Sequence, residues 1–463
     1  MCIIDISHNS FRLDIPPPQR LLPHMSSSST AVTLPRDTAD SGIHRGWWIL
    51  SVAFTAIFMS APGQTHSIGT FRSVMIGGME NVNDTQFSTA YLVGTLFSGF
   101  ALPFLGPLID RFGARVLLPF TSMLLAASCI LMSYVEHLPL LYLGLGMLRL
   151  FGQGLMCLLA TWLVGEWFQE KRGIVMGLMG VGGALSVMTF PLLNRYFILT
   201  YDWQTAWLVL AAILLVTFVI PPWLAVRNRP EEEGLFPDWK HHHSEINPTL
   251  ATEHSPHITT EAWTRNEALR NPTFWKLVMC VTCTSLVGTG LMFYADRVLE
   301  RVGMSGNKPY YVLALQALLA TITCIAAGHF TSKFQARYLL ATAMLLLAAA
   351  LAILISGSSP WMALPFAILL GIHGGIIRTV GSVVWVNYYG REHQGAVAGA
   401  AFSVAVAGSA LGPLALANSA DIFGSLEPAL ILFMCLPIIA GIVVLSAAPP
   451  KRNEPAVDEH RDA

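Results

Sequence analysis

Two arginines lie within stretches that are otherwise apolar enough to cross a membrane. Arg149 interrupts the run GLGMLRLFGQG, and Arg378 interrupts the run IHGGIIRTVGSVVW. A charged side chain at the centre of a membrane helix costs roughly 2.5–3.5 kcal/mol on insertion scales, so it is retained where it faces a cavity or a partner. The planar N–H fork of a guanidinium fits a carboxylate. The two arginines therefore predict an anion site inside a helix bundle.

Few other polar side chains interrupt these apolar stretches. His66 and His373 are the only histidines within them. An imidazole beside a carboxylate site could carry a coupling proton, because its unperturbed pKa is about 6.5; the alternative is a hydrogen-bonded histidine that never titrates. The predicted substrate contacts are Arg378, Arg149, Gln64, His66, Gln153, Tyr294 and His373.

Both arginines also have a structural interpretation, as an ion pair or as a donor to the free carbonyls of a broken helix. An ion pair needs an acidic partner, and the nearest candidates, Glu166 and Asp296, lie at the ends of apolar stretches. The dipeptide Pro62-Gly63 breaks the first stretch and frees backbone groups that a cavity or a neighbouring helix must satisfy. The sequence leaves both interpretations open.

The composition predicts the elements that hold these residues. Of the 463 residues, 54% are hydrophobic and 12% are charged, whereas about 25% of a soluble domain is charged. A helical span needs about 20 mainly apolar residues. Twelve such spans can be counted, at 47–70, 86–105, 115–135, 139–164, 174–194, 205–226, 273–294, 310–328, 337–356, 361–386, 396–417 and 428–447. The expected fold class is an all-α membrane protein.

One polar linker separates the spans six and six, and the basic residues predict their orientation. Of the 27 lysines and arginines, five lie in loops on one side and two, Arg149 and Arg378, lie deep within spans, which leaves 20 in loops or at span ends on the side of both termini. Since basic residues concentrate on the cytoplasmic side, both termini are expected in the cytoplasm of a multi-pass cell-membrane protein. The expected parts are a disordered tail 1–45, an N-terminal half 46–226, a cytoplasmic linker 227–272, a C-terminal half 273–448 and a tail 449–463.

The two halves are related by an internal repeat. The segment GPLIDRFGARVLL (106–118) and the segment GHFTSKFQARYLL (328–340) match at six of thirteen positions, at an offset of 222 residues. The same offset aligns EKRGIVMG (170–177) with EHQGAVAG (392–399). Such repeats are typical of secondary transporters, which move one repeat against the other around a midplane site. Polar residues fall mainly on spans 1, 4, 7 and 10, while every third span is nearly pure hydrocarbon.

The segment GPLIDRFGAR resembles the loop 2–3 motif of the major facilitator superfamily. The motif has a glycine, three residues, Asp-Arg, one residue, a glycine and then a basic position. The resemblance covers about 46–448 and implies two pseudo-symmetric six-helix halves, with spans 1, 4, 7 and 10 around a central cavity. It also implies that the motif controls the conformational balance, with its carboxylate against a helix N-terminus of the other half. The matching positions are Gly106, Asp110, Arg111, Gly113 and Arg115.

Three shorter segments resemble the branch of that superfamily that holds oxalate–formate exchangers and monocarboxylate transporters. They are PGQTHSIGTF (62–71), RLFGQG (149–154) and NRPEEEGLFPD (228–238). In that branch a basic residue in span 8, and in the exchangers another in span 11, are associated with the carboxylate. Spans 8 and 11 of this sequence contain no basic residue.

The expected function is secondary active transport of a small organic anion, a monocarboxylate, by alternating access, with proton symport or anion exchange. The alternatives are a drug or metabolite exporter of the same superfamily and a non-transporting membrane sensor. An enzyme would need a clustered nucleophile and base or a metal set, and the sequence suggests none, so no catalytic, metal or cofactor site is predicted. The expected partners are the organic anion, a proton and the lipid bilayer, without nucleic acid, and the chain is expected to be a monomer.

Overall fold

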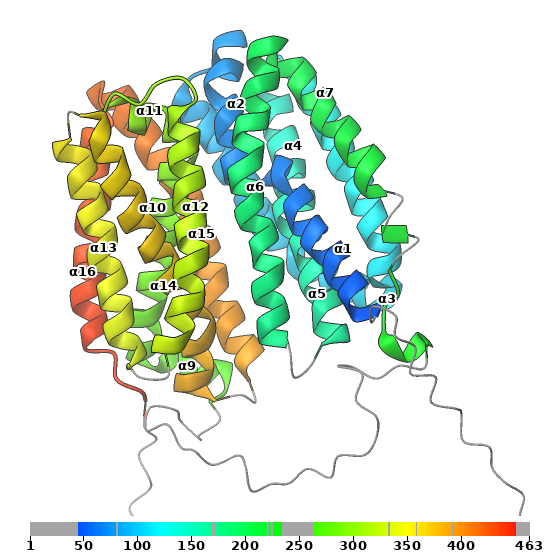
Figure 1. The fold of residues 1–463 in the computed structure, drawn as a ribbon, viewed down its shortest axis with the longest axis vertical. Helices are drawn as coiled ribbons and strands as arrows, with labels where there is room; N and C mark the ends of the chain where they lie inside the picture. Colours follow the sequence, from blue (N-terminus) through cyan, green and yellow to red (C-terminus); the bar gives the residue numbers. More distant parts are fainter. Residues whose placement is uncertain are drawn as a thin grey trace, which may run out of the picture. The chain divides into compact units, whose positions relative to one another are not determined.

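Apolar helices make up almost all of the described chain (Figure 1). The computed structural model describes residues 45–79, 82–168, 172–219, 222–223, 226–233, 263–331, 334–357, 359–390 and 393–450, and no β-strand occurs among them. Nine helical stretches within these ranges are long and apolar enough to cross a membrane. The predicted all-α membrane fold is therefore confirmed, and the nine stretches are consistent with twelve spans.

The described part of the N-terminal half contains three interrupted spans. The first is broken at Pro62, and the fourth and the sixth contain the π-helical stretches η2 and η3. The helices are α1 (Arg45–Met59), η1 (Ala61–Gly63), α2 (Thr65–Gly78), α3 (Asp84–Ser133), α4 (Leu138–Leu148), η2 (Arg149–Met156), α5 (Cys157–Trp167), α6 (Arg172–Thr200), α7 (Trp203–Leu214) and η3 (Leu215–Val219).

Helix α3 covers two of the predicted spans, because the chain changes direction within it at Gly113. This residue has φ 73° and ψ 168°, a conformation with positive φ that a side chain disfavours. The helix that contains the second predicted span (86–105) therefore continues to Gly113, the last glycine of the loop 2–3 motif, and the helix that contains the third (115–135) begins there.

The C-terminal half (residues 273–448) contains the second set of long helices. Two short helices, η4 and α9, lie in the described parts of the linker. The elements are η4 (Pro230–Glu233), α9 (Arg265–Arg270), α10 (Pro272–Phe293), α11 (Ala295–Glu300), α12 (Lys308–Phe330), α13 (Ala336–Ser356), η7 (Pro360–Met362), α14 (Ala363–Tyr389), α15 (Gln394–Phe423) and α16 (Glu427–Leu445).

Polar residues at the helix ends show why several helices begin where they do. Asn83 and Gln86 form a capping box at the start of α3, which satisfies backbone N–H groups that have no partner within the helix. Asn271 accepts from the backbone N–H of Thr273 at 2.8 Å at the start of α10. Asp202 caps α7, and the N–H of Thr205 that donates to its carboxylate lowers the pKa of that group.

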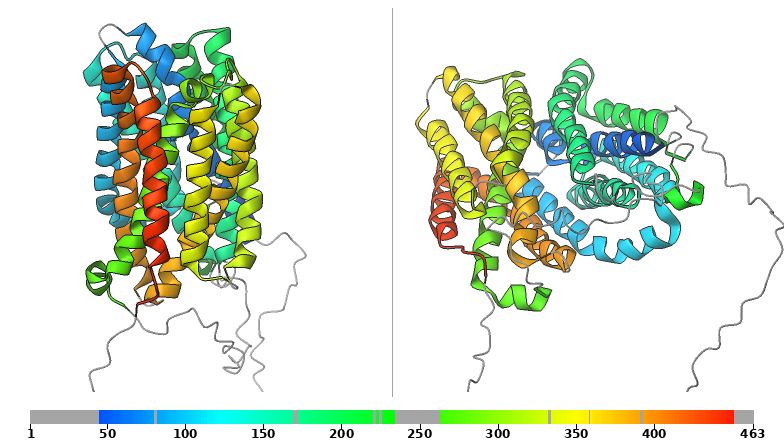
Figure 2. Two further views of the ribbon diagram at one scale, coloured as in Figure 1. Left: turned by 90° about the vertical axis from the view of Figure 1, so that its left-hand side faces the viewer. Right: turned by 60° about the horizontal axis from the view of Figure 1, so that its bottom comes forward.

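Among the described residues, three pairs of helices make the most extensive packing contacts between the two halves. Helix α3 contacts α15, α6 contacts α12, and α2 contacts α10; Figure 2 shows these long helices standing side by side. Large apolar side chains such as Val216, Leu345 and Ile442 are more than 60% exposed on the outer helices, as expected of surfaces that face lipid. The bundle has two ends: the linker end, where α9 lies, and the α11 end, where α2 and α11 lie (Figure 1).

Candidate functional site

A cavity of about 320 Å³ lies between the two halves, and polar residues from both contribute to it. The N-terminal half supplies the start of α2 and one face of α6, and the C-terminal half supplies one residue each from α10 and α14. The lining residues are Ile57, Gln64, Thr65, His66, Gly180, Gly183, Ser186, Val187, Met292 and Arg378. Three of the seven predicted substrate contacts, Gln64, His66 and Arg378, therefore line one cavity.

Arg378 projects from α14 toward walls built by the other half. Its side chain is exposed to the cavity, and no carboxylate among the described residues lies within ion-pairing distance of it. The neighbouring Gly375 packs against Thr323 of α12, so the small residues of α14 face a helix of their own half. Arg378 thus presents a guanidinium to the space between the halves.

The polar groups of α2 that line the cavity are held by specific partners. His66 Nε2 lies 3.1 Å from Ser186 Oγ of α6. Gln64 donates from its amide to Ser60 Oγ at 2.9 Å, and Thr65 Oγ1 lies 2.7 Å from Tyr91 Oη of α3. These hydrogen bonds fix the orientation of donors and acceptors on the wall opposite Arg378.

Arg149 lies behind this wall rather than in it. Its side chain is buried, and its guanidinium lies 4.7 Å from the centre of the Tyr91 ring. Its Nε donates to Thr95 Oγ1 at 2.9 Å, and its Nη1 donates to the Gly63 carbonyl at 3.1 Å. That carbonyl belongs to the break in span 1. The geometry therefore favours the structural interpretation of Arg149, and its contact with substrate stays a prediction.

The other three predicted contacts lie outside the cavity lining. His373 is buried, and its Nδ1 lies 2.8 Å from the Ala343 carbonyl of α13, so the ring joins two helices of one half. Gln153 has a buried side-chain oxygen for which no described residue supplies a donor. Tyr294 lies at the α11 end, between the halves. Their predicted roles in binding stay untested.

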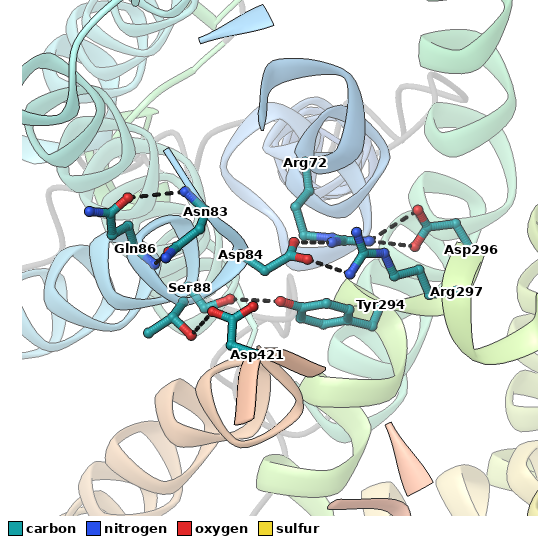
Figure 3. A network of polar contacts seen from close by, with 10 residues as sticks. Arg72, Asn83, Asp84, Gln86, Ser88, Tyr294, Asp296, Arg297 and Asp421 are labelled. Atoms are coloured by element: carbon teal, nitrogen blue, oxygen red, sulfur yellow. Dashed lines mark hydrogen bonds and ion pairs between the residues drawn. The ribbon is translucent and has the colours of Figure 1, made fainter. Parts of the chain in front are cut away.

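An ion network that the sequence reasoning did not predict joins the halves at the α11 end (Figure 3). Arg72 donates to Asp84 at 2.5 Å and to both carboxylate oxygens of Asp296 at 3.0 and 3.1 Å. Arg297 pairs with Asp84 in turn. Arg72 and Asp84 belong to the N-terminal half, whereas Asp296 and Arg297 belong to the C-terminal half. Two of the three ion pairs therefore cross between the halves.

A cation–π contact and two hydrogen bonds surround the ion network. The Arg72 guanidinium lies 4.0 Å from the centre of the Tyr294 ring, and Tyr294 Oη lies 3.0 Å from Ser88 Oγ. Thr85 donates to Asp421 of α15 at 2.5 Å. Each of these contacts also crosses between the halves (Figure 3). The available signal in the sequence was an acid and a base near the ends of spans in each half. The loop count used the bases only as topology markers, and Asp296 was considered only as a partner for Arg149 or Arg378.

The loop 2–3 motif lies at the linker end. The Arg115 backbone N–H donates to the Asn228 side chain at 2.9 Å, and Gly113 has the positive φ given above. The guanidinium of Arg111 lies 5.4 Å from the centre of the neighbouring Phe112 ring. The surroundings of the two remaining motif positions, Gly106 and Asp110, lie outside what the structure describes, so the predicted contact of the Asp110 carboxylate with the other half stays a prediction.

The chain matches the family model described as Major Facilitator Superfamily over residues 45–413 and, in an overlapping match, over residues 311–462. It is 26% identical to monocarboxylate transporter 9 of Mus musculus over 173 residues, which are 37% of this chain and 33% of that protein. It is 24% identical to monocarboxylate transporter 14 of Homo sapiens over 177 residues, 37% of this chain and 34% of that protein. The match thus spans about a third of the length of these relatives.

The fold is similar to that of a solved bacterial homologue of the human lysosomal transporter Spinster. The inward-facing, occupied form of that protein superposes with a TM-score of 0.63 at 14% identity, over 88% of this chain and 97% of that chain. Its inward-facing, unoccupied form gives a TM-score of 0.61 at 14% identity, over 88% and 96% of the two chains.

Proposed function

The chain belongs to the Major Facilitator Superfamily, and from this premise we propose that it carries a small organic anion, a monocarboxylate, across the cell membrane by alternating access. Monocarboxylate transporters are among its relatives by sequence. The α11 end faces outward in this proposal, and the linker and both termini are cytoplasmic, as the distribution of basic residues predicts.

The observation that carries the proposal is the position of Arg378. Its guanidinium lines a cavity that both halves build, without a carboxylate partner among the described residues. A substrate carboxylate would form charge-assisted, bidentate hydrogen bonds with it. The apolar side chains of Ile57, Val187 and Met292 would contact the hydrocarbon part of the substrate. A few polar groups within an otherwise apolar wall are typical of small-molecule sites.

His66 offers a physical basis for coupling to a proton. A protonated imidazole and Arg378 would be two cations in one small cavity, and their repulsion is offset when an anion binds beside them. Anion binding and protonation of His66 would then favour each other, which produces symport. If His66 instead stays a neutral hydrogen-bond partner of Ser186, the same site suits anion exchange. The two modes differ in their response to a proton gradient.

The test is uptake of radiolabelled mono- and dicarboxylates into proteoliposomes, combined with binding to the purified protein. Truncating one partner of a buried charge pair costs about 2–5 kcal/mol, so Arg378→Ala should weaken binding at least about thirtyfold, since 1.4 kcal/mol is tenfold. Arg378→Lys should restore it only in part, because an ammonium keeps the charge and loses the fork. Arg301→Ala removes an arginine of the same half outside the cavity, and it should leave binding unchanged.

Two outcomes separate the remaining possibilities. Proton symport predicts that an inward proton gradient accelerates uptake and that His66→Gln abolishes this acceleration, whereas exchange predicts acceleration by internal carboxylate alone. Normal carboxylate transport by folded Arg378→Ala would remove the main support for the proposal. Export of neutral amphipathic compounds would then be the better hypothesis.

A further inference from the structure

We propose that Asn228, the second residue of the linker, is a positioning residue for the loop 2–3 motif, and that through it the linker acts on the conformational balance of the two halves. The proposal rests on the gating role expected of that motif. It names a residue outside the motif, on a segment that the transport proposal does not use.

Asn228 supplies a helix cap that the motif itself lacks. Because α3 breaks at Gly113, the helical segment that follows starts with backbone N–H groups that have no partner in a preceding turn. Usually the side chain of the first, non-helical residue accepts from the N–H two or three positions later. Gly113 has no side chain, and the Oδ1 of Asn228 accepts from the Arg115 N–H at 2.9 Å instead.

The same asparagine explains why the motif needs a glycine at this position. A Cβ on Gly113 would lie 2.3 Å from the carboxamide atoms of Asn228, far inside van der Waals contact. Gly113 therefore meets two requirements. It adopts the positive φ of the turn, and it leaves space for Asn228, which caps the helical segment after the turn. A substitution at either position is expected to disturb the other.

The start of the linker is itself held against the N-terminal half. The Asn228 backbone N–H donates to Glu232 Oε2 at 3.3 Å, which connects Asn228 to the following short helix η4. Trp167 Nε1, at the end of α5, donates to the Arg227 carbonyl at 3.0 Å, and Val226 is fully buried. The start of the linker is thus anchored to the break inside α3 and to the end of α5, so a shift of this segment would withdraw the cap from the motif.

The internal repeat supports a role specific to the first copy of the motif. The position equivalent to Gly113 in the second copy is Gln335, which precedes α13 with φ −64° and ψ 138° and forms no side-chain cap. The turn with positive φ and the cap from a distant asparagine therefore occur together at the first copy. This is the copy that keeps the Asp-Arg pair of the motif.

The test measures the conformational balance without substrate. Spin labels at Gly77 and Ser305, exposed positions in the two halves at the α11 end, report the distance between the halves in a background without native cysteines. Asn228→Ala should raise the outward-open fraction roughly 2- to 30-fold, the range expected for loss of a helix cap, because the structure contains this cap while the α11 ends are joined. Asn228→Asp keeps the acceptor oxygen and should keep the native distribution. Transport should slow in Asn228→Ala while equilibrium substrate binding stays within a few fold.

Asn271→Ala is the matched control, because Asn271 caps α10 by the same chemistry at 2.8 Å without contact to the motif. It should leave the distribution unchanged. An unchanged distribution in folded Asn228→Ala, or an equal shift in Asn271→Ala, would overturn the proposal. These distances need no substrate, so failure of the organic-anion proposal alone leaves them unaffected.

A double-mutant cycle keeps the proposal testable if one variant folds poorly. Gly113→Ala alone meets both the strain of positive φ and the overlap with Asn228, whereas in the Gly113→Ala/Asn228→Ala protein the overlap is relieved. The combined shift in thermal midpoint should therefore be smaller than the sum of the two single shifts. Additive shifts would show that the two residues do not interact, and the proposal would fail.

Discussion

The ion network at the α11 end makes a quantitative prediction about the conformational balance of the halves. The perturbation is Asp296→Asn, which removes one charge from a pair that crosses between the halves. Arg72 has no exposed surface, and the Asp296 side chain is 26% exposed, so solvent screens the pair only partly. Asp84 still neutralises Arg72 in this variant, and the new amide oxygen can accept one weaker bond. The cost should lie near the lower bound for a charged hydrogen bond, about 1.5 kcal/mol.

This cost falls on the joined state alone, because the pair is broken once the α11 ends separate. The ratio of separated to joined molecules should therefore rise about tenfold, since 1.4 kcal/mol corresponds to a factor of ten. Each half keeps one acid and one base, Arg72 with Asp84 and Asp296 beside Arg297. In the unsubstituted protein, separation thus leaves neither half with a net charge from these four residues, and the network can serve as a reversible contact.

The assay is the distance distribution between spin labels at Gly77 and Ser305 in detergent and in liposomes. Arg297→Gln removes the other cross-half pair, and it should shift the distribution in the same direction by less, because Arg297 is 42% exposed. Arg301→Gln is the control, since the partner of Arg301, Glu427, belongs to the same half. A distribution in Asp296→Asn that matches the unsubstituted protein, with the protein folded, would refute the idea that the pair stabilises the joined state.

Three further predictions concern the break in span 1 and the topology. Arg149→Ala should lower the thermal midpoint with or without substrate, because it leaves a buried carbonyl without a donor at a cost of about 1–3 kcal/mol; equal stability would favour a substrate role. Gly63→Ala should prevent accumulation of folded protein, since its Cβ would lie 2.1 Å from the Leu148 carbonyl oxygen; normal folding would contradict this packing. Reporter fusions within 234–262 and after residue 450 should both report the cytoplasm, and an external signal from either would reverse the proposed orientation.

The fold was predictable because a membrane imposes length and polarity on each helix. Runs of about 20 apolar residues identify spans whatever their tertiary contacts, which is why α13, ARYLLATAMLLLAAALAILIS, is evident from sequence. The break at Pro62 was predictable from the residue itself, because proline lacks the backbone N–H that a helix interior needs. The π-helical stretch η2, with its i→i+5 hydrogen bonds, was not predicted. It packs against the break in span 1, where Gly152 lies against Gly63, and no local sequence pattern indicates it.

The ion network could not be derived because its members are distant in sequence and individually ordinary. Arg72 and Asp296 are 224 residues apart, and each lies near the end of a span, where charges are common. Their pairing depends on which helix ends meet when two six-helix halves associate. A single sequence contains no direct record of that contact.

Arg149 and Arg378 show most clearly what the sequence leaves open. Both are single arginines among glycines in apolar spans, and periodicity alone gives them the same interpretation. The difference lies in what faces each one. The break in span 1 places a free carbonyl opposite Arg149, and its donors bond to Gly63 and Thr95. Around Arg378, α14 is an uninterrupted helix from Ala363 to Tyr389, whose carbonyls there are engaged within the helix. Among the described residues the helix leaves the guanidinium no local acceptor, and the proposed function therefore assigns Arg378 an anion from the cavity.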